Sequence, residues 1–565
     1  MNYMKRNRYI LSAMAASALL AVSCSEFDDY NQAYTQTSPE STNTIWENIS
    51  AEPKLSDFAS LLKKAGYDEQ LGNSRFYTVW APENGTFNFD SLMNVDNDVL
   101  TYKFINSHVA NFNYTLSASN YSTRVHTLNE KSFTLAGTNG AYTYDGNAIS
   151  KMNQPSLNGT IHYMAGAARF LPNIYEYIFE AEGIDTIASF YKRYEKTEID
   201  TKRSVEGSID EDGNQTYEDT VLVTSNTLTG NDYLRANIAE EDSSFTILLP
   251  TDEAYQKAYS AIKKCYNYTD KIQYYSIAQA TGVAAAATNR TVDAASLSDS
   301  LARRMIYLHS VFNNRQKYNR WVLNPNDVDR TDTLYSTQRY KLSNGPEILS
   351  HTIGSAVQMS NGYSRIVDSL AFRPWEVYNP ELNVGIFNST YRPYVTAGTA
   401  RNQDLGYGEL DTEKGLDLVR YLDLIPASET SNPSVYFYIS GVRSTKYNIY
   451  VVTVPADVKV GSTEVARQYK MKVDISYADA NGNATKKSLG TFTTDSTKID
   501  TLMVGTVDFP VSYVNVNNCW PYISLTSSRS TWNRTEWNTI DNRLRIAAVF
   551  LRPVDYDEYL KNEEQ

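Results

Sequence analysis

Five residues near the C-terminus are of types that could bind a sugar. Trp532, Arg534 and Trp537 lie in a polar stretch between two expected strands, and Trp520 and Tyr522 come just before it. Aromatic faces stack on sugar rings, while arginine and asparagine side chains hydrogen-bond to hydroxyl groups. These five residues are therefore the candidate ligand-binding residues. The alternative is that the tryptophans cover the open end of a β-sheet core.

Residues that usually bind metals or act as nucleophiles are few and far apart. The chain has three cysteines (Cys24, Cys265 and Cys519) and five histidines. No Cys or Asp lies at helical spacing from His108 or His309, so we interpret both as buried packing residues. The chain contains neither a Gly-x-Ser-x-Gly turn nor a His-Glu-x-x-His pair. We expect no catalytic residue, metal or cofactor. A catalytic pair of carboxylates that are distant in sequence is the alternative that the sequence leaves open.

The N-terminus has the pattern of a secretory signal. Basic residues precede an apolar run over residues 10–22, which is too short to span a membrane. Small residues then precede Cys24, and this block resembles the lipobox of bacterial lipoproteins. The resemblance implies a signal peptide over 1–23 and a lipid anchor at Cys24. The alternative is an ordinary secretory signal followed by a chance Cys.

An acidic stretch follows Cys24. Residues 25–29 carry acidic side chains, and the next Lys or Arg is Lys54. An acidic stretch in this position resembles the surface-export signal of Bacteroidota lipoproteins. The resemblance implies an outer-membrane lipoprotein displayed on the cell surface, with residues 24–42 as a flexible tether. Incidental charge on a solvated tether is the alternative.

The composition fits a folded, acidic protein. Hydrophobic residues make up 42% and charged residues 21% of the chain. Lys plus Arg number 52 and Asp plus Glu 65, which gives a net charge of −13. Phosphate contacts need clustered Lys and Arg, and no basic block occurs, so nucleic acid is excluded as a partner.

Two segments repeat one pattern of apolar run, proline, polar turn and aromatic residue, at 75–87 and 244–255. Each predicts a buried strand that ends at its proline, and the second predicts a helix that starts at Thr251. Each copy continues with a helix-like segment that carries a His. An Asn-Gly turn into an alternating strand then follows in both copies.

This order of blocks resembles the fasciclin-like adhesion domain. A leading helix also fits, because apolar residues form one stripe over 55–65 and Gly66 can end the helix. The resemblance covers about residues 43–377. It implies two α+β domains in tandem, at 43–175 and 176–377.

Both copies depart from the family pattern. The Tyr of its Tyr-His pair is Ser107 in the first copy and Leu308 in the second, and Ser364 stands where the last block carries a His. The second copy also has an acidic insertion around 206–219. Integrin binding, known for animal members, is therefore not transferred to this chain.

The last third of the chain predicts short strands separated by polar turns. Alternating or apolar runs predict strands at 434–442, 447–454, 469–477, 488–493, 501–511, 520–525 and 544–551. The last run is mostly apolar and predicts a central strand. We expect an all-β antiparallel sandwich over 378–565, which weakly resembles the jelly-roll sandwiches that accompany surface glycan-binding proteins.

Together these patterns predict a non-catalytic cell-surface lipoprotein. It would mediate adhesion or capture an extracellular ligand, either a glycan or a surface or matrix protein. The alternative is a glycan-binding accessory lipoprotein of a polysaccharide-uptake system. An enzyme with a hidden carboxylate pair is the third hypothesis.

Overall fold

The computed structural model describes most of the chain. The described residues are 41–116, 121–138, 140–201, 204–210, 213–219, 222–230, 233–277, 284–406, 409 and 420–564. The predicted signal peptide, Cys24 and most of the predicted tether lie outside them. None of the helices in the described ranges is long and apolar enough to cross a membrane.

The chain divides into two compact units. Unit 1 runs to Asn173 and also includes Glu240–Asp242, while unit 2 comprises 174–239 and the chain from Ser243 onward. Glu241 belongs to unit 1 through a buried salt bridge to Lys131, with 2.7 Å between Oε1 and Nζ. The predicted domain limits at 175 and 377 stay predictions.

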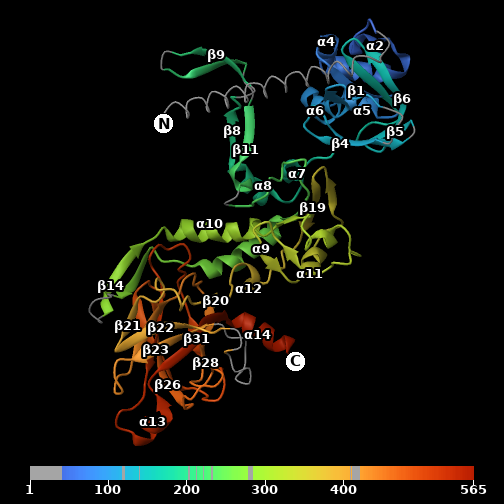
Figure 1. Ribbon diagram of the computed structural model, residues 1–565. Coiled ribbons are helices and arrows are strands. Elements are labelled where there is room, and N and C mark those ends of the chain that lie inside the picture. The colour runs from blue at the N-terminus through green and yellow to red at the C-terminus, as the bar shows by residue number, and fades with distance from the viewer. Residues whose placement is uncertain are drawn as a thin grey trace, which may run out of the picture. The chain divides into compact units, whose positions relative to one another are not determined.

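Unit 1 is built on a seven-stranded sheet with helices packed against it, coloured blue to cyan in Figure 1. Its strands are β1 (Tyr77–Pro82), β2 (Val109–Asn111), β3 (Tyr121–His126), β4 (Ser132–Thr138), β5 (Ala141–Tyr144), β6 (Asn147–Ser156) and β7 (Gly159–Met164). Its helices are α2 (Ile45–Ala51), η1 (Pro53–Leu55), α3 (Ser56–Lys64), α4 (Tyr67–Gly72), α5 (Phe89–Met93), α6 (Asn97–Lys103) and η2 (Ile105–His108). The strand order is β2-β1-β7-β6-β5-β4-β3, and within this sheet β1 and β7 form the parallel pair.

The predicted leading helix is confirmed. Leu55, Phe58, Leu61 and Leu62 are all fully buried on η1 and α3, so the apolar stripe faces the core. Gly66 follows with φ +74°, a left-handed conformation that glycine adopts without steric cost and that ends the helix.

Unit 2 begins with a smaller sheet of the same design, in the order β15-β12-β19-β18. Its strands are β12 (Phe245–Pro250), β15 (Val311–Asn313), β18 (Val357–Met359) and β19 (Gly362–Val367). Its helices are α7 (Ile174–Glu180), α8 (Asp185–Lys192), η3 (Thr227–Thr229), α9 (Asp252–Lys263), η4 (Lys264–Tyr266), α10 (Ala294–Tyr307), η5 (Arg320–Val322), α11 (Gly345–Ser350) and α12 (Pro374–Val377). Two-stranded ribbons join these elements: β8 (Glu195–Ile199) with β11 (Leu222–Asn226), β9 (Val205–Ile209) with β10 (Gln215–Asp219), β13 (Lys271–Ile277) with β14 (Ala284–Thr291) and β16 (Leu334–Tyr335) with β17 (Lys341–Leu342).

The two copies predicted from the sequence share one strand-pairing scheme. In each, the first buried strand is antiparallel to the short strand after the histidine and parallel to the strand after the Asn-Gly turn. Both first strands end at the expected proline, and α9 begins one residue after Thr251, whose side chain caps it. The tandem α+β arrangement is therefore confirmed.

A buried asparagine fixes the same turn in both copies. The Asn158 carboxamide oxygen accepts a hydrogen bond from the backbone N–H of Ile45 (2.8 Å), at the start of α2. The Asn361 oxygen accepts one from Ile174 (2.9 Å), at the start of α7. Each asparagine thus satisfies an N–H that a helix start leaves without an intrahelical partner.

The strands after these turns differ from the prediction. Every residue of β7 is buried, because the strand pairs on both edges and packs on both faces, so the predicted alternation is wrong there. In β19 two of six residues are buried, without strict alternation.

The glycine after each asparagine admits no side chain. Gly159 has φ +142° and Gly362 φ +140°, and a Cβ at either would collide with the carbonyl oxygen of Tyr77 or Phe245.

We expect Gly159→Ala to lower the free energy of unfolding of unit 1 by about 2–4 kcal/mol. Urea denaturation measures the loss. The matched control is Gly85→Ala, at φ +78° with open space around the new methyl group, which should cost about 1 kcal/mol. Equal losses in the two variants would contradict the collision.

The C-terminal part of unit 2 is a sandwich of two antiparallel sheets. The first has the order β22-β23-β31-β25-β28, with β20 beside β31, and the second has β21-β24-β29-β26-β27, with the short β30 paired parallel to β26. The strands are β20 (Leu382–Asn383), β21 (Tyr394–Thr396), β22 (Gly398–Asp404), β23 (Arg420–Pro426), β24 (Ser434–Tyr438), β25 (Lys446–Thr453), β26 (Gln468–Ala478), β27 (Ala484–Thr493), β28 (Asp500–Asp508), β29 (Tyr522–Ser527), β30 (Ile540–Asp541) and β31 (Leu544–Pro553). Two helices complete it, α13 (Arg534–Thr539) and α14 (Val554–Glu563).

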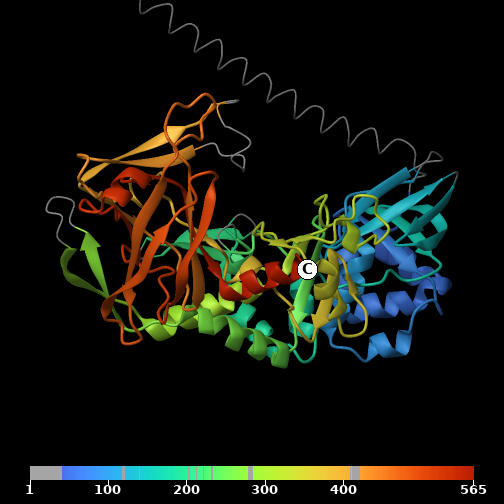
Figure 2. The same ribbon diagram turned by 90° about the horizontal axis from the view of Figure 1, so that it is seen from below.

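The seven strands predicted in this region are all present, and the predicted sandwich is confirmed. β31 lies between β23 and β25, as its apolar sequence predicted for a central strand. The second copy and the sandwich share one continuous hydrophobic core. Figures 1 and 2 both show α9 and α10 running alongside each other in this unit.

Candidate functional site

The outer face of the second sandwich sheet presents aromatic residues. Val435 and Phe437 of β24, like Ile523 and Leu525 of β29, are fully buried in the core. Since side chains alternate along a strand, the residues between them point to the opposite face. Register places Tyr436 opposite Ser524 and Tyr438 opposite Tyr522 on that face.

Five half-buried residues on this face form what we call the aromatic strip: Tyr391, Tyr394, Tyr436, Tyr438 and Trp520. Ring centroids lie 5.7 Å apart for Tyr394 and Tyr436, and 5.4 Å apart for Tyr438 and Trp520. Tyr391 adds a ring 6.4 Å from Trp520. The rings come from the segment before β21, from β21 and β24, and from the residue next to β29, so the sheet holds them in place.

Two lysines share one carboxylate on this face. The carboxylate of Asp474, on β26, lies 3.2 Å from Lys472 Nζ and 3.8 Å from Lys486 Nζ. Burial raises the pKa of Tyr436, and Tyr394 and Asp474 add to that rise. The Tyr436 hydroxyl therefore stays neutral at physiological pH and can both donate and accept a hydrogen bond. Rings flanked by neutral hydroxyls suit a polyhydroxylated ligand.

Trp520 and Tyr522 of the sequence-predicted set lie at one end of this sheet. Trp520 belongs to the aromatic strip, but Tyr522 is only 4% exposed. Tyr274 and Tyr275 of β13 lie beside both Tyr522 and Trp520 and leave no space for a ligand between them, so part of Trp520 is covered there too. Tyr522 thus supports the strip from below, 5.9 Å from the Tyr436 ring.

Trp532, Arg534 and Trp537 lie at the other end. β29 separates them from Tyr522, and six residues of strand span about 20 Å. Trp532 is 96% exposed, whereas Trp537 is half-buried under the Arg529 guanidinium, which lies 4.1 Å from the ring centroid. The structure therefore divides the five predicted residues between two places.

Four strip residues were missed by the sequence reasoning: Tyr391, Tyr394, Tyr436 and Tyr438. A signal was present, because Ser434–Tyr438 alternates a core residue with a tyrosine. Which tyrosines of neighbouring strands meet depends on register across β21, β24 and β29, and no local pattern encodes that.

The histidines of the two copies are packing residues, as interpreted. His108 is fully buried, with Nδ1 donating to the Phe104 carbonyl (2.8 Å) and Nε2 accepting from the Ala168 N–H (3.0 Å). His309 is also buried, and its Nδ1 donates to the Met305 carbonyl (2.8 Å). Burial lowers the pKa of each ring to about 4. A neutral ring fixed in this way does not serve as a base near pH 7.

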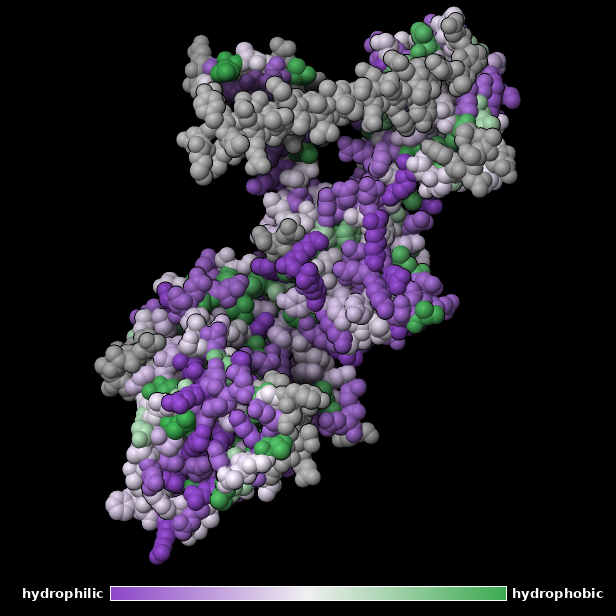
Figure 3. Space-filling view, viewed as in Figure 1, coloured by the Kyte–Doolittle hydropathy of each residue, from purple (hydrophilic) through white to green (hydrophobic). Residues whose placement is uncertain are grey.

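Burial outweighs the effect of the arginine that acts on each buried thiol, Arg443 on Cys265 and Arg290 on Cys519. Burial raises the pKa of Cys265 to about 11 and that of Cys519 to about 12, and both are unpaired. No group of three His, Cys, Asp or Glu side chains that could hold a metal ion occurs within the described ranges. Figure 3 shows a largely hydrophilic face on which hydrophobic residues are scattered.

Comparison with known families and structures identifies the first copy. The family model named Fasciclin domain matches residues 53–167. No curated protein matches the chain.

Three solved structures are similar to parts of the chain. A FAS1 domain pair from the insect cell adhesion molecule fasciclin I is 11% identical, covers 59% of this chain and 97% of its own, and has a TM-score of 0.20. The CBM22-2 xylan-binding domain from Paenibacillus barcinonensis Xyn10C is 10% identical, with 31% and 98% covered and a TM-score of 0.19. A xylan-binding domain from CBM 22 is 12% identical, with 29% and 97% covered and a TM-score of 0.15. These TM-scores are too low to support an argument about this chain. The fold assignment therefore rests on the strand pairing described above.

Proposed function

We propose that this chain is a non-catalytic binding protein of the bacterial cell surface. It is held at the outer membrane by lipid on Cys24 and captures an extracellular ligand through its C-terminal sandwich. Its fasciclin-like copies mediate adhesion. The Fasciclin domain match at 53–167 supports the adhesive part, since that domain is associated with adhesion.

The aromatic strip is the observation that carries the capture function. Its rings occupy one face of a rigid sheet, are half-buried rather than covered, and have a carboxylate paired with two lysines beside them. This combination suits a neutral saccharide, which binds by stacking and by hydrogen bonds to hydroxyl groups. Glycan capture also supports the alternative role, that of an accessory protein in polysaccharide uptake.

A glycan array probed with the soluble chain, residues 25–565, tests the strip. We expect binding to a polysaccharide and expect Tyr436→Ala with Trp520→Ala to weaken it roughly 10- to 100-fold, because each lost stacking contact is worth about 1 kcal/mol. The matched variant, Trp532→Ala with Trp537→Ala, removes two aromatic rings from the other end of β29.

Each outcome assigns the site differently. Loss of binding only in the first variant supports the strip. Loss of binding only in the second variant indicates that the ligand binds at the segment around α13. Absence of glycan binding by the unmodified chain contradicts saccharide capture and leaves protein-mediated adhesion.

A further inference from the structure

Three large apolar side chains are exposed at one end of the sheet of unit 1. Phe76 is 54% exposed, Phe112 72% and Leu157 61%. Tyr77 of β1 lies opposite Asn111 of β2, so Phe76 and Phe112 are the next opposite pair. Leu157 lies in the turn before β7, which pairs with the other edge of β1. We call these three residues the apolar end.

Phe112 has an unfavourable backbone conformation. Its φ is +74°, in the left-handed region that residues other than glycine, asparagine and aspartate rarely adopt. The Thr78 hydroxyl fixes this conformation, because it donates to the Phe112 carbonyl (2.8 Å) and accepts from the Tyr114 N–H (2.8 Å). Strained conformations of this kind cluster at functional sites.

The second copy has polar residues at the same three positions. Its matching strand pairs make Ser244, Asn314 and Ser360 the equivalents of the apolar end. Asn314 is buried, and its side chain donates to the Ser244 hydroxyl (3.4 Å). The fold therefore does not require apolar residues here, and their presence is particular to the first copy.

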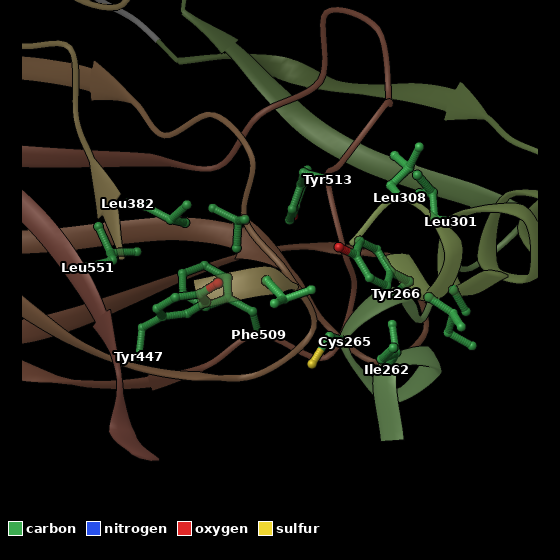
Figure 4. Packing of buried hydrophobic residues seen from close by; sticks show 14 of the residues in the cluster. Ile262, Cys265, Tyr266, Leu301, Leu308, Leu382, Tyr447, Phe509, Tyr513 and Leu551 are labelled. Carbon is green, nitrogen blue, oxygen red and sulfur yellow. The ribbon is translucent and has the colours of Figure 1, made fainter. Parts of the chain in front are cut away.

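The second copy also differs in what it packs against. Its core continues into the sandwich, and Figure 4 shows Ile262 and Cys265 of the second copy next to Phe509 of the sandwich. Unit 1 contains no such second domain, because it consists of the chain up to Asn173 and Glu240–Asp242. The apolar end is therefore available to a partner from outside unit 1.

The chain enters unit 1 beside the apolar end. The described residues start at Ser41, and the Asn43 carbonyl accepts a hydrogen bond from the Leu157 N–H (2.8 Å). The chain between Cys24 and Ser41 can reach at most about 60 Å. A lipid on Cys24 therefore keeps this end of unit 1 close to the membrane.

The segments that form the apolar end carry little charge. Residues 73–76, 112–115 and 153–157 contain one charged residue, Arg75, which lies over the Tyr77 ring at 5.7 Å from its centroid. These segments can therefore approach lipid headgroups without burying a carboxylate of their own. Phenylalanine and leucine side chains insert favourably at the boundary between headgroups and acyl chains.

We propose that the apolar end rests on the membrane surface, with Phe76, Phe112 and Leu157 at the boundary between lipid headgroups and acyl chains. This inference rests on the lipid anchor at Cys24 proposed above. The anchor limits the distance of unit 1 from the membrane, whereas the contact sets which end of unit 1 faces it.

Vesicles of phosphatidylcholine with a nickel-chelating lipid test the proposal. The soluble chain, residues 25–565, binds them through a histidine tag before residue 25, which replaces the lipid and keeps the local concentration high. Leu157→Cys carries a polarity-sensitive fluorophore, and Cys265 and Cys519 are buried and do not compete for it. We expect the emission to rise about twofold or more on the vesicles, and nitroxide lipids to quench it.

Two further variants locate the contact. Phe76→Ser with Phe112→Asn, combined with the Leu157 label, gives the first copy the residues of the second and should abolish the rise. This variant should fold, because asparagine tolerates a positive φ. The matched control is a label on Ser150→Cys, an exposed position that register places at the opposite end of the sheet.

A rise at Leu157 that is absent at Ser150 and lost in the double variant supports the contact. The proposal is overturned if the Leu157 label does not respond, if the Ser150 label responds equally, or if the double variant keeps the rise. Sedimentation of the soluble chain tests another occupant. Dimerisation that the double variant abolishes would assign the apolar end to a second copy of the chain and overturn the membrane contact.

Mass spectrometry of the N-terminal peptide of the native protein tests the anchor separately. An unmodified Cys24 contradicts the anchor and, with it, the contact in the cell. A lipidated Cys24 without a response at Leu157 contradicts the contact alone.

Discussion

Acidification from pH 7 to pH 4.5 is expected to lower the free energy of unfolding of unit 1 by about 2 kcal/mol for each of two buried histidines. His108 and His162 are fully buried, and burial lowers the pKa of each to about 4 from an ordinary 6.5. The unfolded chain takes up these protons near pH 6.5, but the folded chain does not until about pH 4. The stabilisation is therefore complete above pH 6.5 and is lost as the pH falls toward 4.

The hydrogen bonds of both rings explain why the charged form is disfavoured. Each ring donates from one nitrogen to a carbonyl and accepts on the other: His108 from the Ala168 N–H, and His162 from the Asn153 N–H (3.2 Å). Protonation of the accepting nitrogen would turn it into a donor. Two N–H donors would then face each other, the ring N–H and the backbone N–H.

Urea denaturation between pH 7 and 4.5 measures this effect. Between pH 6 and 4.5, His108→Gln should make the dependence of unfolding free energy on pH shallower by about 1.4 kcal/mol per pH unit. The matched control is His126→Gln, which replaces an exposed ring on β3. A slope that both variants leave unchanged would show that His108 does not carry the effect.

Removing the carboxylate of Asp423 is expected to destabilise the sandwich by about 3–5 kcal/mol. Asp423 is 0% exposed, on β23, and Arg543 Nε donates to its Oδ1 (2.6 Å). Arg545 lies opposite Asp423 in the β23–β31 register and is itself buried. Without Asp423, two guanidinium groups share the carboxylate of Glu464.

Urea denaturation of Asp423→Asn at pH 7 measures this loss in the unfolding of unit 2. Asp404→Asn is the matched control, because Asp404 pairs with Arg420 on the same sheet but is largely exposed. We expect less than about 1 kcal/mol for the control. Comparable losses in the two variants would contradict the role assigned to burial.

The sequence predicted those features that local patterns encode. Apolar periodicity located α3, the two proline-ended strands and all seven strands predicted in the sandwich, because burial of one face sets the spacing of apolar residues. The repeated order of blocks revealed the two copies before any strand pairing was known. Where β7 is buried on both faces, the same reasoning predicted an alternation that is absent.

Tertiary structure alone decided which residues meet. Trp520 and Trp532 are close in sequence, yet β29 carries the chain from one end of the sheet to the other between them. Tyr394 and Tyr436 are far apart in sequence, yet register places them side by side on neighbouring strands. Side-chain types and periods are properties of the chain, whereas the proximity of distant residues follows from how sheets pair and pack.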